Sequence, residues 1–113
     1  MNKVVLSILV DNTSGVLSRV SGLFSRRGYN IDSLTVGETQ DPSISRMTVV
    51  VNGDNQIIEQ IKRQVNKLED VREITELVTG DSVTRELILV KVASNLNNRQ
   101  SIIAIADIFR AKI

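Results

Sequence analysis

The segment from Asp11 to Gly15 holds the residue types in this sequence that are best suited to binding a ligand. It combines an acid, an amide, hydroxyl side chains and a glycine directly before an apolar stretch with helical periodicity. Exposed N–H groups at the start of a helix favour a carboxylate or a phosphate. Glycine at position 15 would let a ligand approach the main chain, because no Cβ stands in the way. The segment therefore predicts an anion-accepting loop at a helix N-terminus.

Asparagines at positions 12 and 30 are the candidate polar contacts. The amide of Asn12 both donates and accepts, so it could hold either end of an amino acid. Asn30 follows the expected end of the helix and enters the next strand. Both also have an ordinary structural interpretation, in which Asn12, Thr13 or Ser14 caps the helix and Asn30 belongs to a turn. Residue pattern alone favours this ordinary interpretation, because such loops are common in proteins.

The chain contains no cysteine and no histidine. Without cysteine there are no disulfides, thiolate nucleophiles or cysteine-ligated metal sites in it. Without histidine, its serine, threonine and lysine side chains have no imidazole to activate them. Glu73 and Glu76 are three apart in one expected strand, so they point to opposite faces and form no acid–base pair. We therefore expect no catalytic residue, no metal site and no cofactor in this chain.

Charge and hydropathy exclude further classes of partner. The chain has 14 lysines and arginines against 13 aspartates and glutamates, scattered along its length. This balance gives no electrostatic footprint for nucleic acid or for an anionic membrane surface. Apolar runs are short and interrupted, so none is expected to span a bilayer. The lack of cysteine fits a reducing cytoplasm, which is the expected location.

The apolar pattern predicts the elements that would position the loop and the asparagines. Val4–Val10 is a nearly continuous apolar run, typical of a strand covered on both faces. From Val16 the period becomes helical. Arg26 and Arg27, followed by Gly28, are typical of a helix end, where cations complement the helix dipole and glycine adopts a left-handed cap.

The pattern continues in the same alternation as far as Gly80. Further strands are predicted at residues 31–36, 44–51 and 71–78, and a second helix, capped by Asp54, lies between the last two. Ile31 and Leu34 differ in parity, so a bulge is expected near residues 32–33. The order βαββαβ predicts a ferredoxin-like α+β domain in which both helices lie on one face of a four-stranded antiparallel sheet.

After Gly80 the pattern begins again. Leu87–Val92 reads as a strand with apolar residues of both parities, and a helical stripe then comprises Ile102, Ile105, Ala106, Phe109 and Ile113. A lone βα unit cannot bury two apolar faces by itself. It either docks on the first domain or a partner, or is the incomplete start of a second domain of a longer protein. We expect the latter, with domains at residues 1–80 and 81–113.

Two other classes of protein share this element order. RNA-recognition domains stack bases on aromatic residues of their central strands. Aromatic residues make up 3% of this chain, and ISRMTVVV, the predicted third strand, has none, so this class is rejected. Small ferredoxin-like phosphatases bind phosphate in the first loop with help from an arginine. The loop DNTSG contains an acid and no arginine, which disfavours a hydrolase, although the fold alone does not dismiss one.

The stretch DNTSGVLSRVSGLFSRRGYNIDSLTV resembles the N-terminal part of acetolactate synthase small subunits, and DPSISRMTVVV and TRELILVKV extend the resemblance. The resemblance implies an ACT domain, followed by the beginning of a C-terminal domain. It also implies a non-catalytic regulatory subunit that activates a large catalytic subunit and binds valine, or a related branched-chain amino acid, for feedback inhibition. Thiamine diphosphate, magnesium and FAD are expected on that large subunit. A stand-alone amino-acid-sensing ACT module of another enzyme is the alternative.

The same resemblance implies an effector site that is shared between the two subunits of a homodimer of ACT domains. The residues that match the family's site are Asn12, Gly15, Val16 and Leu17, with Asn30 and Ile31 supplied across the dimer interface. Ser14 stands where many relatives have proline, which leaves the rigidity of the loop open.

Overall fold

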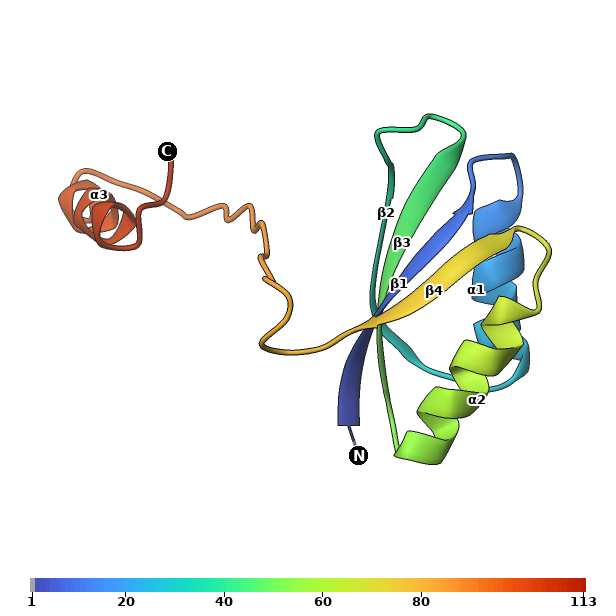
Figure 1. The fold of residues 1–113 in the computed structure, drawn as a ribbon. Helices are drawn as coiled ribbons and strands as arrows, with labels where there is room; N and C mark the ends of the chain where they lie inside the picture. The colour runs from blue at the N-terminus through green and yellow to red at the C-terminus, as the bar shows by residue number, and fades with distance from the viewer. Residues whose placement is uncertain (1) are drawn as a thin grey trace. The chain divides into compact units, whose positions relative to one another are not determined.

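The computed structural model describes residues 2–113, which divide into two compact units between Val83 and Thr84. The elements of the first unit are β1 (Asn2–Asp11), α1 (Val16–Arg26), β2 (Ile31–Glu38), β3 (Ile44–Gly53), α2 (Asn55–Asn66) and β4 (Val71–Leu77). Its strands form one antiparallel sheet in the order β2-β3-β1-β4. Both helices cover the same face of this sheet (Figure 1). The predicted ferredoxin-like α+β fold is confirmed.

The core of the first unit lies between the sheet and the two helices. Strand side chains alternate between faces, so even-numbered residues of β1 and odd-numbered residues of β3 point toward the helices. The buried apolar side chains are Leu6, Ile8, Val10, Val16, Val20, Leu23, Phe24, Met47, Val49, Val51, Ile58, Ile61 and Val65. The apolar run of β1 had predicted cover on both faces, but the helices of this unit cover only one. Val5 and Leu9 are half-buried on the other, open face.

The predicted signals mark the ends of both helices. Gly28 has φ 71°, and the N–H of Tyr29 donates to the carbonyl of Phe24 at 2.9 Å, which closes the last turn of α1. Asp54 caps α2, because its carboxylate accepts from the N–H of Ile57 at 2.9 Å. The start of α1 differs, since its N-cap residue is Gly15, which has no side chain to offer.

The predicted bulge in β2 is also confirmed. The register between β2 and β3 shifts between Ile31 and Ser33. Beyond the shift, Leu34 pairs with Val49 and Val36 with Met47, which places both β2 side chains on the face that the helices cover. Leu34 and Val36 nevertheless remain 37% and 47% exposed. The reason is that β2 is an edge strand, so its chain provides neighbours on one side only.

The second unit departs from the sequence prediction in two respects. Residues 87–92 form no strand, because no partner strand exists among the described residues of this unit. The helix α3 (Arg99–Ile108) is shorter than its predicted stripe. Arg110, with φ 55°, ends the helix, and the N–H of Ala111 donates to the carbonyl of Ala106 at 2.8 Å. Phe109 and Ile113 therefore lie beyond the helix and are exposed.

Residues 88–94, α3 and the C-terminal residues line an apolar hollow of about 620 Å³ within the second unit. Leu87 and Leu89 are 91% and 92% exposed. None of the helices at residues 2–113 is long and apolar enough to cross a membrane.

The two units should differ in their protection from amide hydrogen exchange. We expect the slowest exchange in β1 and β3, whose N–H groups are paired in the sheet and covered by the core. Residues 84–93 should exchange within the shortest labelling times, because they contribute to no sheet. Exchange followed by mass spectrometry measures both regions in one experiment. Equal protection of β3 and residues 84–93 would show that the second unit is as firmly held as the first.

Candidate effector site

Hydrogen bonds from Asn12 fix the loop between β1 and α1. Its main-chain N–H donates to the carbonyl of Ser43 at 2.8 Å. Its side-chain Nδ2 donates to the carbonyl of Pro42 at 2.8 Å and to Oε1 of Glu38 at 3.2 Å. A carbonyl can only accept, so the nitrogen of the Asn12 amide must face Pro42. The amide oxygen is left as the group of Asn12 that can meet a ligand, and it can only accept.

The turn between β2 and β3, which receives these bonds, is itself held by Asp41. The Asp41 carboxylate accepts from the N–H of Ser43 at 3.0 Å and from its hydroxyl at 2.8 Å. These bonds to the backbone and side chain of Ser43 hold the pKa of Asp41 below its usual value. The Pro42 carbonyl is thereby kept in place as the acceptor for Asn12.

Free N–H groups lie at the start of α1. No acidic residue occurs in its first turn and no side chain caps it. The N–H of Val16 makes only a long 3.5 Å contact to the carbonyl of Thr13. Across residues 2–113, the N–H groups of Leu17 and Ser18 meet no backbone or side-chain acceptor. This helix end therefore has free donors of the kind that a carboxylate needs, and binding there remains a prediction.

The two apolar residues predicted for the site have different surroundings. Val16 is only 3% exposed and belongs to the core, so only its main chain can meet a ligand. Leu17 is 46% exposed and can offer its side chain as an apolar wall. Adjacent helix positions point about 100° apart, so Val16 can face the core while Leu17 faces outward.

Ion pairs neutralise the charges on either side of the loop. Nε of Arg72 lies 2.5 Å from the Asp11 carboxylate, and Nε of Arg19 lies 2.6 Å from that of Asp70. The hydrogen bond that Arg19 donates to the Asp70 carboxylate raises the pKa of Arg19 above its usual value. Asp11, which by its charge would oppose an incoming carboxylate, is thus paired. The Arg19 guanidinium also lies against Gly15, where an added Cβ would be 2.9 Å from Nη1.

The other predicted residues, Asn30 and Ile31, lie at the far end of α1. The helix has 11 residues, so its ends are roughly 15 Å apart at about 1.5 Å per residue. The Asn30 amide donates to the Asp32 carboxylate at 2.8 Å. Within one chain the structure brings Asn12, Gly15 and Leu17 together, but it does not bring Asn30 and Ile31 to them.

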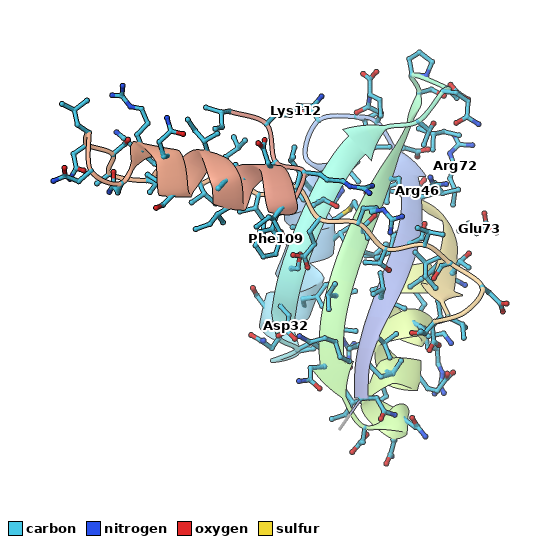
Figure 2. The ribbon with its side chains drawn as sticks, turned by 90° about the vertical axis from the view of Figure 1, so that its left-hand side faces the viewer. Asp32, Arg46, Arg72, Glu73, Phe109 and Lys112 are labelled. Atoms are coloured by element: carbon cyan, nitrogen blue, oxygen red, sulfur yellow. The ribbon has the colours of Figure 1, made fainter. Side chains whose placement is uncertain are left out.

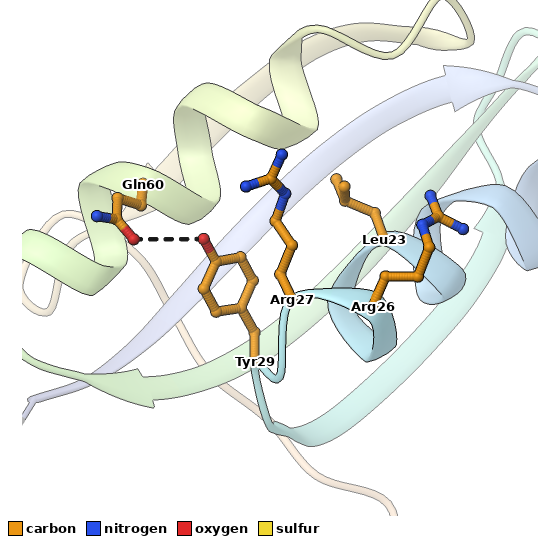
Figure 3. Close-up of a pocket in the computed structure, with 5 residues that line it drawn as sticks. All are labelled: Leu23, Arg26, Arg27, Tyr29 and Gln60. Carbon is orange, nitrogen blue, oxygen red and sulfur yellow. Dashed lines mark hydrogen bonds between the residues drawn. The ribbon is translucent and has the colours of Figure 1, made fainter.

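A hollow of about 590 Å³ lies near Asn30 at this far end, lined by Leu23, Arg26, Arg27, Tyr29 and Gln60 (Figure 3). The Tyr29 hydroxyl donates to Oε1 of Gln60 at 3.4 Å, and its ring meets that of Phe24 edge to face at 6.3 Å. These contacts fix the chain that leads into Asn30. The hollow itself is lined by cations and offers no acidic group to an ammonium.

The open face of the sheet carries Arg46 and Glu73, which Figure 2 shows opposite the helices. Glu73 pairs with Leu9 on this face, whereas Glu76 pairs with Leu6 and lies on the helix side. There Glu76 accepts from Lys62 at 3.3 Å. The two glutamates point to opposite faces, as the sequence predicts.

Sequence reasoning missed Glu38 as a member of the loop's surroundings. It is the last residue of β2 and contacts Asn12 across 26 positions of the chain. A contact between a loop and a distant strand end leaves no local signal in the sequence. Only the strand order, which sets the start of β3 and the turn before it beside the end of β1, could have indicated it.

Comparison with known proteins gives the family. Residues 6–73 match the family described as AHAS small subunit-like ACT domain, and residues 85–113 match the family described as small subunit of acetolactate synthase. The isozyme 3 small subunits of acetolactate synthase from Salmonella typhimurium and Escherichia coli are each 50% identical over 109 residues. The matched region is 96% of this chain and 67% of either relative.

Solved structures agree with the sequence comparison. The crystal structure of the small subunit of acetolactate synthase from Thermotoga maritima matches the whole chain with a TM-score of 0.82 and 34% identity, and 71% of that chain is covered. The ACT domain of GTP pyrophosphokinase from Chlorobium tepidum matches 66% of this chain and 96% of its own, with a TM-score of 0.57 at 13% identity, and shares the fold alone.

The fold and these matches define the first unit as an ACT domain. The chain belongs to the acetolactate synthase small subunit family, and it spans about two thirds of the length of the relatives that it matches.

The backbone at Gly15 provides a test of how the loop is held. Gly15→Ala should lower the free energy of unfolding by about 1–2 kcal/mol, because a Cβ disfavours the left-handed φ of 86°. Gly37→Ala is the matched control, since an added Cβ there meets nothing within 4 Å in an extended strand. Urea unfolding of both variants at one protein concentration measures the difference. Equal losses would mean that the loop relaxes away from this conformation.

Proposed function

We propose that this chain binds a branched-chain amino acid, valine in the first place, as the effector-sensing part of an acetolactate synthase regulatory subunit. It acts on a large catalytic subunit that carries thiamine diphosphate, magnesium and FAD, and it transmits feedback inhibition. Membership of the small subunit family supports this role. The observation that carries the proposal is the uncapped start of α1 beside the exposed side chain of Leu17. Free N–H groups suit the carboxylate, and an apolar wall suits a branched side chain.

The exposed edge of the sheet supports a homodimer. Leu34 and Val36 on the helix side of β2, and Leu17 of α1, remain 37–47% exposed, and we take these three side chains together as an apolar patch. The outer side of β2 also offers main-chain groups that no strand of the first unit pairs. Antiparallel pairing of β2 with the same strand of a second copy would satisfy these groups and cover the patch. Such a contact is self-complementary about a two-fold axis.

This dimer would complete the site from its separated halves. Antiparallel pairing brings the Ile31 end of one β2 beside the Glu38 end of the other. Glu38 contacts Asn12, so the partner subunit's Asn30 and the partner subunit's Ile31 would approach the loop. Each dimer would then hold two equivalent sites, each with its carboxylate-binding helix end in one subunit and its closing amide in the other.

Binding at such a site can regulate an enzyme without any catalytic group in this chain. Coupling between an effector and a distant site is typically about 1–3 kcal/mol, which is enough to change activity several-fold or more. If the chain served an enzyme other than acetolactate synthase, it would still bind the amino acid. It would then leave a large subunit of acetolactate synthase unaffected.

The patch predicts which substitution abolishes dimerisation. Leu34→Glu should give monomers in sedimentation velocity at micromolar concentration, because two carboxylates would be buried at a contact that needs apolar groups. Thr75→Glu, on the opposite edge strand and the open face, is the control and should leave the dimer intact. A Leu34→Glu protein that stays dimeric would place the interface elsewhere.

The shared site predicts that two inactive variants restore each other. Gly15→Asp and Asn30→Ala should each lose valine binding in calorimetry, the first by charge repulsion at the helix end and the second by loss of the closing amide. Mixing and refolding the two should restore about a quarter of the sites, because half of the dimers are mixed and each has one intact site. No recovery would exclude a shared site.

The same samples test the regulatory role. Unaltered chain should form no acetolactate from pyruvate, thiamine diphosphate and magnesium by itself. Added to a large subunit, it should change that subunit's rate in a valine-dependent way, whereas the Asn30→Ala chain should not. If neither chain changes the rate of the large subunit at saturating concentration, the result would support the alternative of an ACT module serving another enzyme.

A further inference from the structure

We propose that Glu38, together with the amide oxygen of Asn12, binds the α-ammonium group of the effector and restricts the site to free amino acids. Carboxylates of the same shape that lack an ammonium group, such as 2-oxo acids, would be excluded. This inference rests on the proposed function, because it assigns a charge partner within that effector site.

Glu38 is placed at the site by both its strand and its neighbour. It pairs with Ser45, which is 5% exposed on the helix side of the sheet, so the Glu38 side chain rises on the side where α1 begins. Its Oε1 accepts from the amide of Asn12 at 3.2 Å. Its second carboxylate oxygen accepts no hydrogen bond and joins no ion pair within residues 2–113. Glu38 is therefore held in position while keeping an acceptor for a ligand.

The charge of Glu38 is unpaired, unlike those of Asp11 and Arg19 beside the loop. Asp11 is matched by Arg72, and Arg19 by Asp70. No ion pair of the described chain includes Glu38. The loop thus has a free carboxylate on its β2 side, while the helix start offers free N–H groups. A zwitterion matches this arrangement at both of its ends.

Asn12 contributes its oxygen because its nitrogen is already engaged. Nδ2 donates to Pro42 and to Glu38, which occupies both of its hydrogens. An ammonium group donates three hydrogen bonds and accepts none, so it suits two neighbouring oxygens from Asn12 and Glu38. Asn12 thereby serves the ammonium end of an amino acid and not the carboxylate end.

A 2-oxo acid of the same carbon skeleton would meet this site differently. Its carboxylate could reach the helix N-terminus, but its carbonyl oxygen would face the Asn12 and Glu38 oxygens. Acceptor would then oppose acceptor, and the Glu38 charge would have no ammonium group to balance it. Such discrimination is useful to a sensor of amino acids, because the enzyme that it regulates consumes an oxo acid, pyruvate.

The test is Glu38→Gln, which keeps an oxygen for the Asn12 amide and removes only the charge. Calorimetry at low ionic strength uses L-valine, L-leucine and L-isoleucine, with 3-methyl-2-oxobutanoate as the probe that lacks an ammonium group. The amino acid that binds the unaltered chain best should bind Glu38→Gln roughly 10-fold or more weakly, the range for a lost charge-assisted hydrogen bond. Glu73→Gln, on the open face, is the matched control and should bind normally.

The second measurement is the preference for valine over the oxo acid. The unaltered chain should bind the oxo acid far more weakly than valine, and this difference in affinity should be smaller in Glu38→Gln. Amino acid binding by Glu38→Gln at unaltered affinity, while Asn30→Ala loses it, would overturn the assignment of Glu38 and leave the proposed function standing. If none of the three amino acids binds the unaltered chain, the proposed function falls and this assignment with it.

Discussion

The strand β2 lies at the edge of its sheet with an apolar side that the other elements of the first unit leave partly exposed. In this fold α1 crosses over the sheet before β2 begins. The strand β2 is the last one on its side of the sheet, so its neighbour, β3, lies on one flank only. Burying Leu17, Leu34 and Val36 requires a second surface that is also apolar. A second copy of the same edge supplies one that is complementary by symmetry. The proposed dimer thus follows from an unsatisfied edge and not from a specialised interface.

The length of α1 explains why the proposed effector site would be split between subunits. The residues that precede the helix and those that follow it are kept at its two ends, however the side chains are arranged. A two-fold axis beside β2 would reverse the direction of the neighbouring chain and place its Ile31 end at the Glu38 end of the first. A ligand bound there would contact both copies. Affinity for the ligand and affinity between the subunits would then depend on each other.

Much of the fold was predictable because its signals are local. Gly28, Asp54 and the parity break between Ile31 and Leu34 each mark a helix end or a bulge within a few residues, and the structure has all of them. Glu38 was missed because its partner, Asn12, is distant in sequence. The strand at residues 87–92 was predicted wrongly, since an apolar run indicates burial, but a strand also needs a neighbour to pair with. The local sequence pattern predicts helices and strands, whereas contacts between residues far apart in the sequence depend on how the strands pair.

Linkage gives the proposed site its regulatory property. A ligand that binds the dimer but not the monomer favours the dimer by an amount that grows with the logarithm of its concentration. The chain need not change shape to report the amino acid, because the contact between subunits would itself be the element that the ligand stabilises. The open face of the sheet, with Arg46 and Glu73, would take no part in that contact. Pairing of the edge strands would therefore leave this face of the first unit unused.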